Sequence, residues 1–179
     1  MTVPMAPWRL GLAIALPLIA VAVAVVLANR VSSAAAHDPG QPLAVPVVFQ
    51  PGSTTAGCAA LDAALPADLD GHPRRPMVAA EPGVAAWGDP AVILRCGISD
   101  PEELNCGSEL TVFNGVSWLP LTGTGSTTYV AVDRASRVAL TLDDSVGVGA
   151  VQALSNVIRT VMRERAVCVD GVLNPVDAP

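Results

Sequence analysis

The sequence predicts an α+β domain, a two-layer sandwich in which two helices cover one face of an antiparallel sheet of about four to six strands. Three observations support this prediction: an Asn-Gly hairpin signal between apolar runs, a second apolar hairpin after it, and an amphipathic helical period near the end of the chain. One N-terminal transmembrane helix precedes the domain. The expected order is a cytoplasmic N-terminus (1–9), the membrane helix (10–28), a linker (29–46), the domain (47–172) and a tail (173–179).

The apolar run at residues 10–28 carries no charged side chain and is long enough to cross a membrane. A helix over it spans about 28 Å, close to the ~30 Å hydrocarbon core of a bilayer. Arg9 and Arg30 flank the run, and the weak charge bias favours a main domain outside the cell membrane. The alternative is a cleaved signal peptide, because Ser33 to Ala36 supplies small residues for cleavage near Ala36 and secretion.

A short helix and an inner strand are expected in the first half of the domain. Ser53-Thr54-Thr55 offers an N-cap for a helix over residues 56–65, which Pro66 ends. Cys58 lies on the same face of that helix as Leu61 and Leu65. Residues 91–96 predict an inner strand, with Cys96 on the same side as Val92 and Leu94. Both cysteines therefore face the core, which favours a Cys58–Cys96 disulfide.

Two hairpins and a helix complete the expected fold. Asn114-Gly115 predicts a type I′ turn that pairs Phe113 with Val116 and Thr111 with Trp118. A second hairpin joins residues 128–132 to 138–142 through a turn at 133–136. The helix covers about residues 148–165, with Asp143, Asp144 and Ser145 near its positive end and Arg163 and Arg165 near its negative end. Its inward residues are Val151, Leu154, Ile158 and Val161, and its outward residues are Gln152, Ser155, Arg159 and Arg163.

The four cysteines occur at long, irregular spacings with no CxxC pair, which argues against a structural zinc site and for two disulfides. Three connectivities are possible. With Cys58 and Cys96 facing one another, Cys106 in the loop after the strand is left to pair with Cys168 beyond the last helix. Two disulfides indicate an oxidising compartment outside the cytoplasm.

Composition limits the partners. From residue 31 onward the chain has 8 Arg, because two of its 10 basic residues precede that position, and 16 acidic residues, a net charge of −8. Nucleic acid and anionic lipid headgroups require clustered basic charge, so neither is expected. All basic residues are Arg and none is Lys. No motif indicates a cofactor or a metal, and the oligomeric state is left open.

The segment from Asp70 to Gly97 holds the least ordinary residues, namely His72 to Pro76, Trp87-Gly88-Asp89-Pro90 and Leu94-Arg95-Cys96-Gly97. Together with Cys58-x-x-Leu61 and Leu65-Pro66 before them, they resemble a family of exported actinobacterial proteins known as domain of unknown function 3515. The resemblance covers about residues 47–165. It implies an anchored or secreted cell-envelope protein with Cys58 and Cys96 as the family's usual cysteines and with Cys106 and Cys168 as an addition. It implies no activity and no catalytic residue.

Two interpretations of these residues remain open. The structural one makes Trp87 a core residue, the following Gly-Asp-Pro a tight turn, and Arg95 an exposed residue or a partner of a carboxylate such as Glu109. The functional one has Arg74, Arg75 and Arg95 converging beside Trp87 to bind an anionic ligand through their guanidinium forks. His72 is the one candidate general base, but no nucleophile motif accompanies it.

The sequence therefore predicts a single-pass envelope protein, not an enzyme, whose domain acts by binding another envelope protein. A receptor for a small anionic ligand that uses Arg74, Arg75, Arg95 and Trp87 is the alternative. A hydrolase using His72 comes third.

Overall fold

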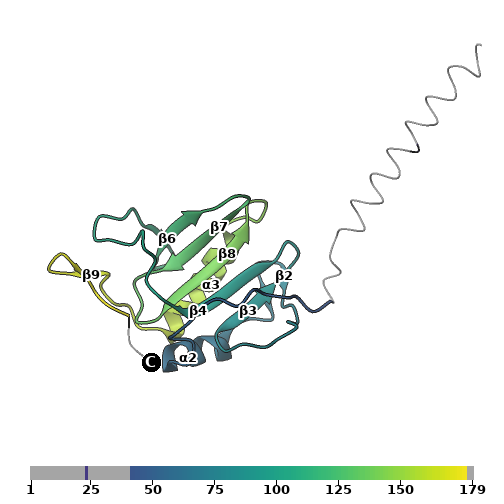
Figure 1. Cartoon of the computed structure of the whole chain (residues 1–179), viewed down its shortest axis with the longest axis horizontal. Coiled ribbons are helices and arrows are strands. Elements are labelled where there is room, and N and C mark those ends of the chain that lie inside the picture. Colours follow the sequence, from purple (N-terminus) through teal and green to yellow (C-terminus); the bar gives the residue numbers. More distant parts are fainter. Residues whose placement is uncertain (1–22, 24–40, 177–179) are drawn as a thin grey trace, which may run out of the picture. The chain divides into compact units, whose positions relative to one another are not determined.

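The structure, a computed structural model, describes residue 23 and residues 41–176 of the chain (Figure 1). The predicted membrane helix at 10–28 lies, apart from Val23, outside the described residues. Among those residues, no helix combines the length and the apolar character needed to cross a membrane. The domain is described by itself below, with the element labels of Figure 1.

Six antiparallel strands form the central sheet, in agreement with the predicted α+β class. The strand order is β3–β4–β8–β7–β6–β5, so the strand that carries Arg95 and Cys96 lies between two neighbours, as predicted for an inner strand. The strands are β3 (Val84–Trp87), β4 (Val92–Ile98), β5 (Thr111–Phe113), β6 (Val116–Thr122), β7 (Ser126–Ala131) and β8 (Arg137–Asp143). Two further hairpins form two-stranded sheets of their own, β1 (Asp68–Leu69) with β2 (His72–Pro73) and β9 (Cys168–Val169) with β10 (Val172–Leu173).

Both helices, α2 (Ala56–Ala64) and α3 (Gly149–Val161), pack on one face of the sheet (Figure 1). The main core lies between them and the strands, and it includes Trp87, Leu94, Trp118, Leu140 and Leu154. A smaller core covers part of the opposite face, where Leu104 from the β4–β5 loop and Leu173 from β10 pack with residues of β6, β7 and β8. The two-layer prediction therefore describes the main core, and loops and the C-terminal hairpin cover part of the second face.

The N-cap and the inward face of α2 are as the sequence predicts. The side chain of Thr55 accepts a hydrogen bond from the backbone N–H of Cys58 at 3.4 Å. Cys58 and Leu61 are buried, and the helix ends at Ala64, before Pro66.

The turn chemistry of the β5–β6 hairpin is also confirmed. Phe113 pairs with Val116 and Thr111 with Trp118. Asn114 and Gly115 both have positive φ, at 48° and 79°, as a type I′ turn requires. The β1–β2 and β9–β10 hairpins turn through Asp-Gly pairs in which both residues also have positive φ.

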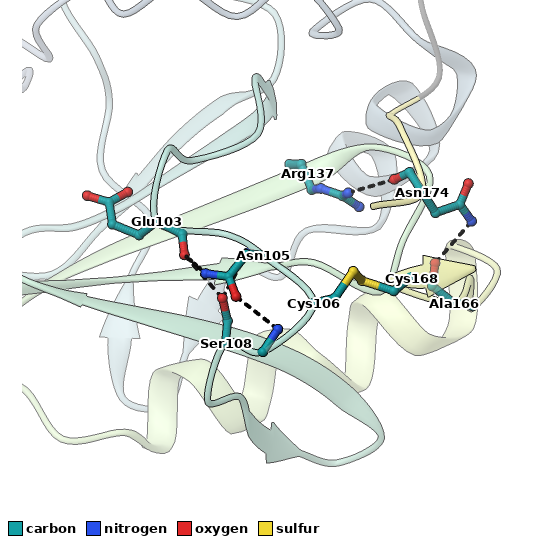
Figure 2. Close-up of a disulfide and its surroundings, with 9 residues drawn as sticks. Glu103, Asn105, Cys106, Ser108, Arg137, Ala166, Cys168 and Asn174 are labelled. Atoms are coloured by element: carbon teal, nitrogen blue, oxygen red, sulfur yellow. Dashed lines mark hydrogen bonds between the residues drawn. A yellow bond between two sulfur atoms is a disulfide. The ribbon is translucent and has the colours of Figure 1, made fainter. Parts of the chain in front are cut away.

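Both predicted disulfides are present. Cys58 on α2 bonds to Cys96 on β4 with their Cα atoms 5.6 Å apart, and Cys106 bonds to Cys168 at 5.9 Å. Figure 2 shows the second bond joining the β4–β5 loop to the C-terminal hairpin, next to Asn174. This hairpin belongs to the folded domain, because Asn174 also donates to Ala166 O at 3.0 Å and accepts at its backbone oxygen from Arg137 at 3.2 Å.

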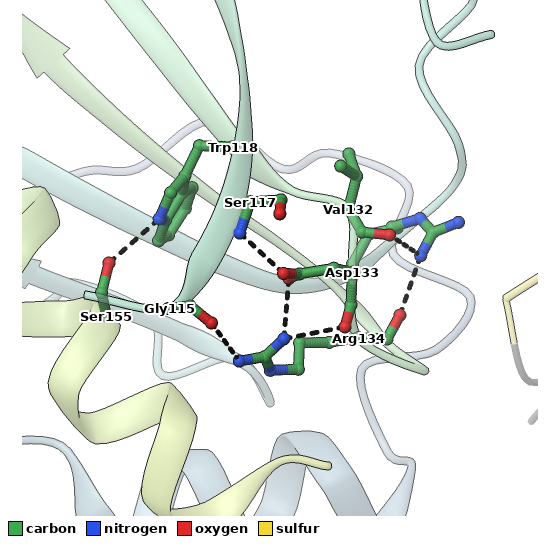
Figure 3. Close-up of polar contacts among 8 residues, drawn as sticks. Gly115, Ser117, Trp118, Val132, Asp133, Arg134 and Ser155 are labelled. Atoms are coloured by element: carbon green, nitrogen blue, oxygen red, sulfur yellow. Dashed lines mark hydrogen bonds and ion pairs between the residues drawn. The ribbon is translucent and has the colours of Figure 1, made fainter. Parts of the chain in front are cut away.

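Two predictions about α3 are wrong. The helix ends at Val161 rather than near Arg165, because the chain beyond it pairs with the β7–β8 turn. Glu164 forms an antiparallel backbone β-bridge with Arg134, and the backbone N–H of Arg165 donates to Asp133 O. Ser155 was expected to face outward and is fully buried, since its hydroxyl accepts from Trp118 Nε1 at 2.9 Å (Figure 3). A short polar side chain breaks the apolar period here in order to satisfy an indole N–H.

Candidate functional site

Residues 41–52, called the strap below, run across β3 and β4 before the chain enters α2 (Figure 1). Leu43 forms a parallel β-bridge with Met77, and the backbone N–H of Leu43 donates to Pro76 O at 2.8 Å. At the other end, Gly52 N donates to Gly97 O at 2.9 Å. Residues 41–46, which the sequence assigned to the linker, are thus hydrogen-bonded to the domain.

Arg95 holds the middle of the strap. On β4 it pairs with Val84 on one side and Ala139 on the other, on the sheet face away from the helices. Its Nη2 donates to the backbone oxygen of Pro46 at 3.1 Å, in place of the expected carboxylate partner Glu109. Burial lowers the pKa of the Arg95 guanidinium from its ordinary value, and the charge of Glu81 offsets part of that shift.

Arg75 holds the start of the strap. It is 4% exposed, and Nη2 donates to Gln41 O at 3.1 Å while Nη1 donates to Gly88 O at 3.3 Å. One guanidinium thereby links the strap to the turn that follows Trp87. The planar fork of arginine carries donors on separate nitrogens and so suits two carbonyls that belong to different segments.

Arg74 and Trp87 form a separate contact on the helix side. The guanidinium carbon of Arg74 lies 5.1 Å from the centre of the Trp87 ring, in a cation–π arrangement, and Nη2 lies 3.8 Å from Asp62 of α2. Trp87 is fully buried, and its Nε1 donates to Pro66 O at 3.0 Å. The structure therefore brings Arg74 alone to Trp87, because consecutive residues of an extended chain point to opposite faces and Arg75 turns toward the strap.

Two glycines of the same motifs make room for close approaches. Gly97 has φ of +84°, and a side chain there would collide with the backbone of Gly52 in the strap. Gly88 has φ of +65°, and a side chain there would collide with the ring of His72. A positive φ and the absence of a Cβ are both needed at these positions.

His72 holds its own hairpin together. Nδ1 lies 3.1 Å from Leu69 O and 3.1 Å from Asp70 O. Because both neighbours are carbonyl oxygens, which can only accept, Nδ1 carries the hydrogen that it donates to them. Among the residues that the structure describes, no three His, Cys, Asp or Glu side chains are close enough together to hold a metal ion.

The strap carries an exposed apolar surface that is not among the predicted site residues. Val47 is 78% exposed, Val48 46% and Phe49 79%, and these three residues are called the strap patch. Val78, on the segment that pairs with Leu43, is 69% exposed. The available signal was the apolar run Val45-Pro46-Val47-Val48-Phe49, which lacks the alternation of a half-buried strand.

Residues 133–136, predicted only as the turn of the second hairpin, form a buried polar cluster. Arg134 is 1% exposed, its Nη1 lies 2.8 Å from Asp133 Oδ1, and its Nη2 donates to Gly115 O at 3.0 Å (Figure 3). Asp133 Oδ2 accepts from Ser117 N at 2.7 Å. The pair balances its own charge and ties β7–β8 to β5–β6.

The comparisons with known proteins give one match. A family described as "Protein of unknown function (DUF3515)" matches residues 14–167, a range that begins inside the apolar N-terminal run and ends before Cys168. No curated protein and no solved structure matches the chain. With a match over most of its 179 residues, the chain belongs to the DUF3515 family of proteins of unknown function.

Proposed function

We propose that this protein is a membrane-anchored, extracytoplasmic module of the cell envelope that binds another protein through the strap patch. Two disulfides are consistent with an exported domain. The apolar run at residues 10–28 supports an anchor, and secretion after cleavage near Ala36 is the alternative.

The observation that carries the proposal is the exposure of Val47 and Phe49 at nearly four fifths of their surface. Neither side chain contributes to a core, so folding alone gives no reason for three consecutive apolar residues there. Aromatic side chains such as that of Phe49 are enriched at the centre of protein interfaces, and contiguous exposed apolar patches mark interaction sites.

The strap patch is also held in place before any partner arrives. Arg75, Arg95 and the Leu43 and Gly52 backbone bonds fix the strap on both sides of the patch. A preorganised segment loses little conformational entropy on binding, which increases the affinity that a small apolar surface provides. The net charge of −8 from residue 31 onward favours a protein partner over nucleic acid or anionic lipid.

Site-specific photo-crosslinking in the full chain, expressed in its own envelope, tests the proposal. A crosslinker at Val47 or Phe49 should give one adduct of the same mass, and Phe49→Asp should abolish the adduct from position 47. The control position is Val112, which is 63% exposed on the edge strand β5. Equal adducts from all three positions, or none from the strap, would refute binding through this patch.

The other two functions have less support in the contacts. A receptor built on Arg74, Arg75, Arg95 and Trp87 would need a ligand to replace the bonds that Arg75 and Arg95 make to Gln41 O and Pro46 O. A hydrolase would need a nucleophile near His72, whose ring packs against Gly88.

A further inference from the structure

A depression of about 350 Å³ lies at the carboxyl end of α3. Its wall includes three arginines, one carboxylate and two apolar side chains, namely Arg134, Arg159, Arg163, Glu164, Val161 and Met162. The volume lies at the lower end of the range typical of small-molecule sites. None of these residues belongs to the strap, so the inference below goes beyond the proposed function.

Most arginines of the described domain are bonded to other residues, and the two that are not both line this depression. Six of the eight between residue 31 and the end of the described chain have a partner: Arg74, Arg75, Arg95, Arg134, Arg137 and Arg165. Within residues 41–176, no hydrogen bond or ion pair is found for Arg159 or Arg163, and both line the depression. Arg159 lies in the last turn of α3 and Arg163 lies two residues beyond the end of the helix, and both contribute to the wall of the depression.

The local charge is positive in a domain that is otherwise acidic. Asp133 neutralises Arg134 at 2.8 Å, and Glu164 offsets one of the two remaining arginines, which leaves one positive charge. The negative end of the α3 dipole explains why cations are tolerated there. The dipole does not explain why Arg159 and Arg163, which have no partner among the described residues, line the same depression as the buried Arg134.

We propose that this depression binds a small ligand that joins an oxyanion, either a carboxylate or a phosphate ester, to a short apolar group. Arg159 and Arg163 supply the guanidinium forks that match such oxyanions. Val161 and Met162, which are half-buried and buried, provide the apolar wall for the body of the ligand. Arg134 also lines the depression, and its bonds to Asp133 and to Gly115 O fix its position there.

Titration of the full chain with phenyl phosphate, benzoate and neutral benzamide, followed by amide NMR shifts, tests this site. Saturable shifts at residues 159–164 are expected with a Kd in the millimolar range for at least one anion and none for benzamide. The tighter of the two anions identifies the source as a phosphate ester or a carboxylate. Binding should weaken as salt is added, because the two arginines are exposed.

Matched variants distinguish specific binding in the depression from a general effect of the protein's charge on anion binding. Arg159→Gln and Arg163→Gln should each weaken binding about two- to fivefold and the pair together about tenfold. Glu164→Gln should tighten it. Arg74→Gln removes the same charge elsewhere and should leave the Kd unchanged. Absence of saturable shifts, an unaltered Kd in the double variant, or an equal loss in Arg74→Gln would overturn the proposal.

Discussion

Arg95 Nη2 donates a 3.1 Å hydrogen bond to the backbone oxygen of Pro46, across 49 positions of sequence. The contact fixes the strap on the sheet beside three exposed apolar residues. An arginine that the sequence suggests for ligand binding therefore serves to position a neighbouring segment, and this changes what its substitution should do.

Arg95→Ala should loosen the strap without unfolding the domain. We expect the free energy of unfolding to fall by about 1–2 kcal/mol, around the lower end of the range for a charged hydrogen bond, because the group is only partly buried. Hydrogen exchange at the Leu43 and Gly52 amides should become faster. Arg159→Ala is the control and should change neither quantity, because Arg159 has no hydrogen bond or ion pair with any other described residue. Unaltered exchange at both amides in Arg95→Ala would contradict this role.

Gly97→Ala should destabilise the domain more than Gly125→Ala does. Both glycines have positive φ, at 84° and 73°, so both substitutions carry the left-handed strain of about 1–2 kcal/mol. A side chain at Gly97 also collides with Gly52, whereas nothing lies within 4 Å of one at Gly125. Urea denaturation measures the difference between the two variants. Equal losses of stability would mean that the strap does not cross close to Gly97.

Removal of the Cys58–Cys96 bond should cost more than removal of the Cys106–Cys168 bond. The loop-entropy term favours the second bond by only about 0.4 kcal/mol, since the separations are 38 and 62 residues. Cys58 and Cys96 are each 1% exposed, so paired Ala substitutions also leave a cavity in the core. Thermal unfolding of the two double-Ala variants compares them, and a greater loss for the Cys106 and Cys168 pair would show that burial does not decide the order.

Ser145→Ala should raise the pKa of the Asp143 carboxyl. The hydroxyl and the backbone N–H of Ser145 both donate to Asp143 Oδ1, which holds this pKa below its ordinary value. A lowered folded-state pKa contributes stability above the unfolded pKa, and this contribution is lost as the pH falls through the folded value. The variant should therefore differ from the wild type near neutral pH and converge with it in acid.

Carboxyl carbon NMR titration of Asp143 measures this shift directly. Ser108→Ala is the matched control, because its hydroxyl bonds only to the backbone, at Glu103 O and Asn105 N. An unchanged Asp143 titration in Ser145→Ala would remove the Ser145 hydroxyl as the cause.

The predictions that succeeded depend on short windows of sequence. The Asn114-Gly115 turn specifies its own register through two positive φ values, and helical or strand periodicity tells which way Cys58 and Cys96 point. Strand β3 and the hairpins β1–β2 and β9–β10 were not predicted, since strands of two to four residues carry too little pattern.

The bonding partners of the candidate site residues could not be predicted from the sequence, for a physical reason. Arg74, Arg75, Arg95 and Trp87 are identified by their residue types, but a guanidinium binds whichever acceptor the fold brings near. For Arg75 and Arg95 these acceptors are backbone oxygens of the strap, 34 and 49 positions away. No pattern in the neighbouring sequence predicts a hydrogen bond between residues so far apart in the chain.

The sequence by itself determined the α+β class, the two disulfides, the hairpin register and the membership of a family without a known activity. The tertiary structure alone decided that Arg75 and Arg95 bond to the strap while Arg74 contacts Trp87, that Ser155 and Arg134 are buried, and that Val47 to Phe49 stand exposed. The difference arises because backbone propensity and side-chain direction are set by neighbours in sequence, whereas burial and hydrogen-bond partners are set by segments that meet only in the folded chain.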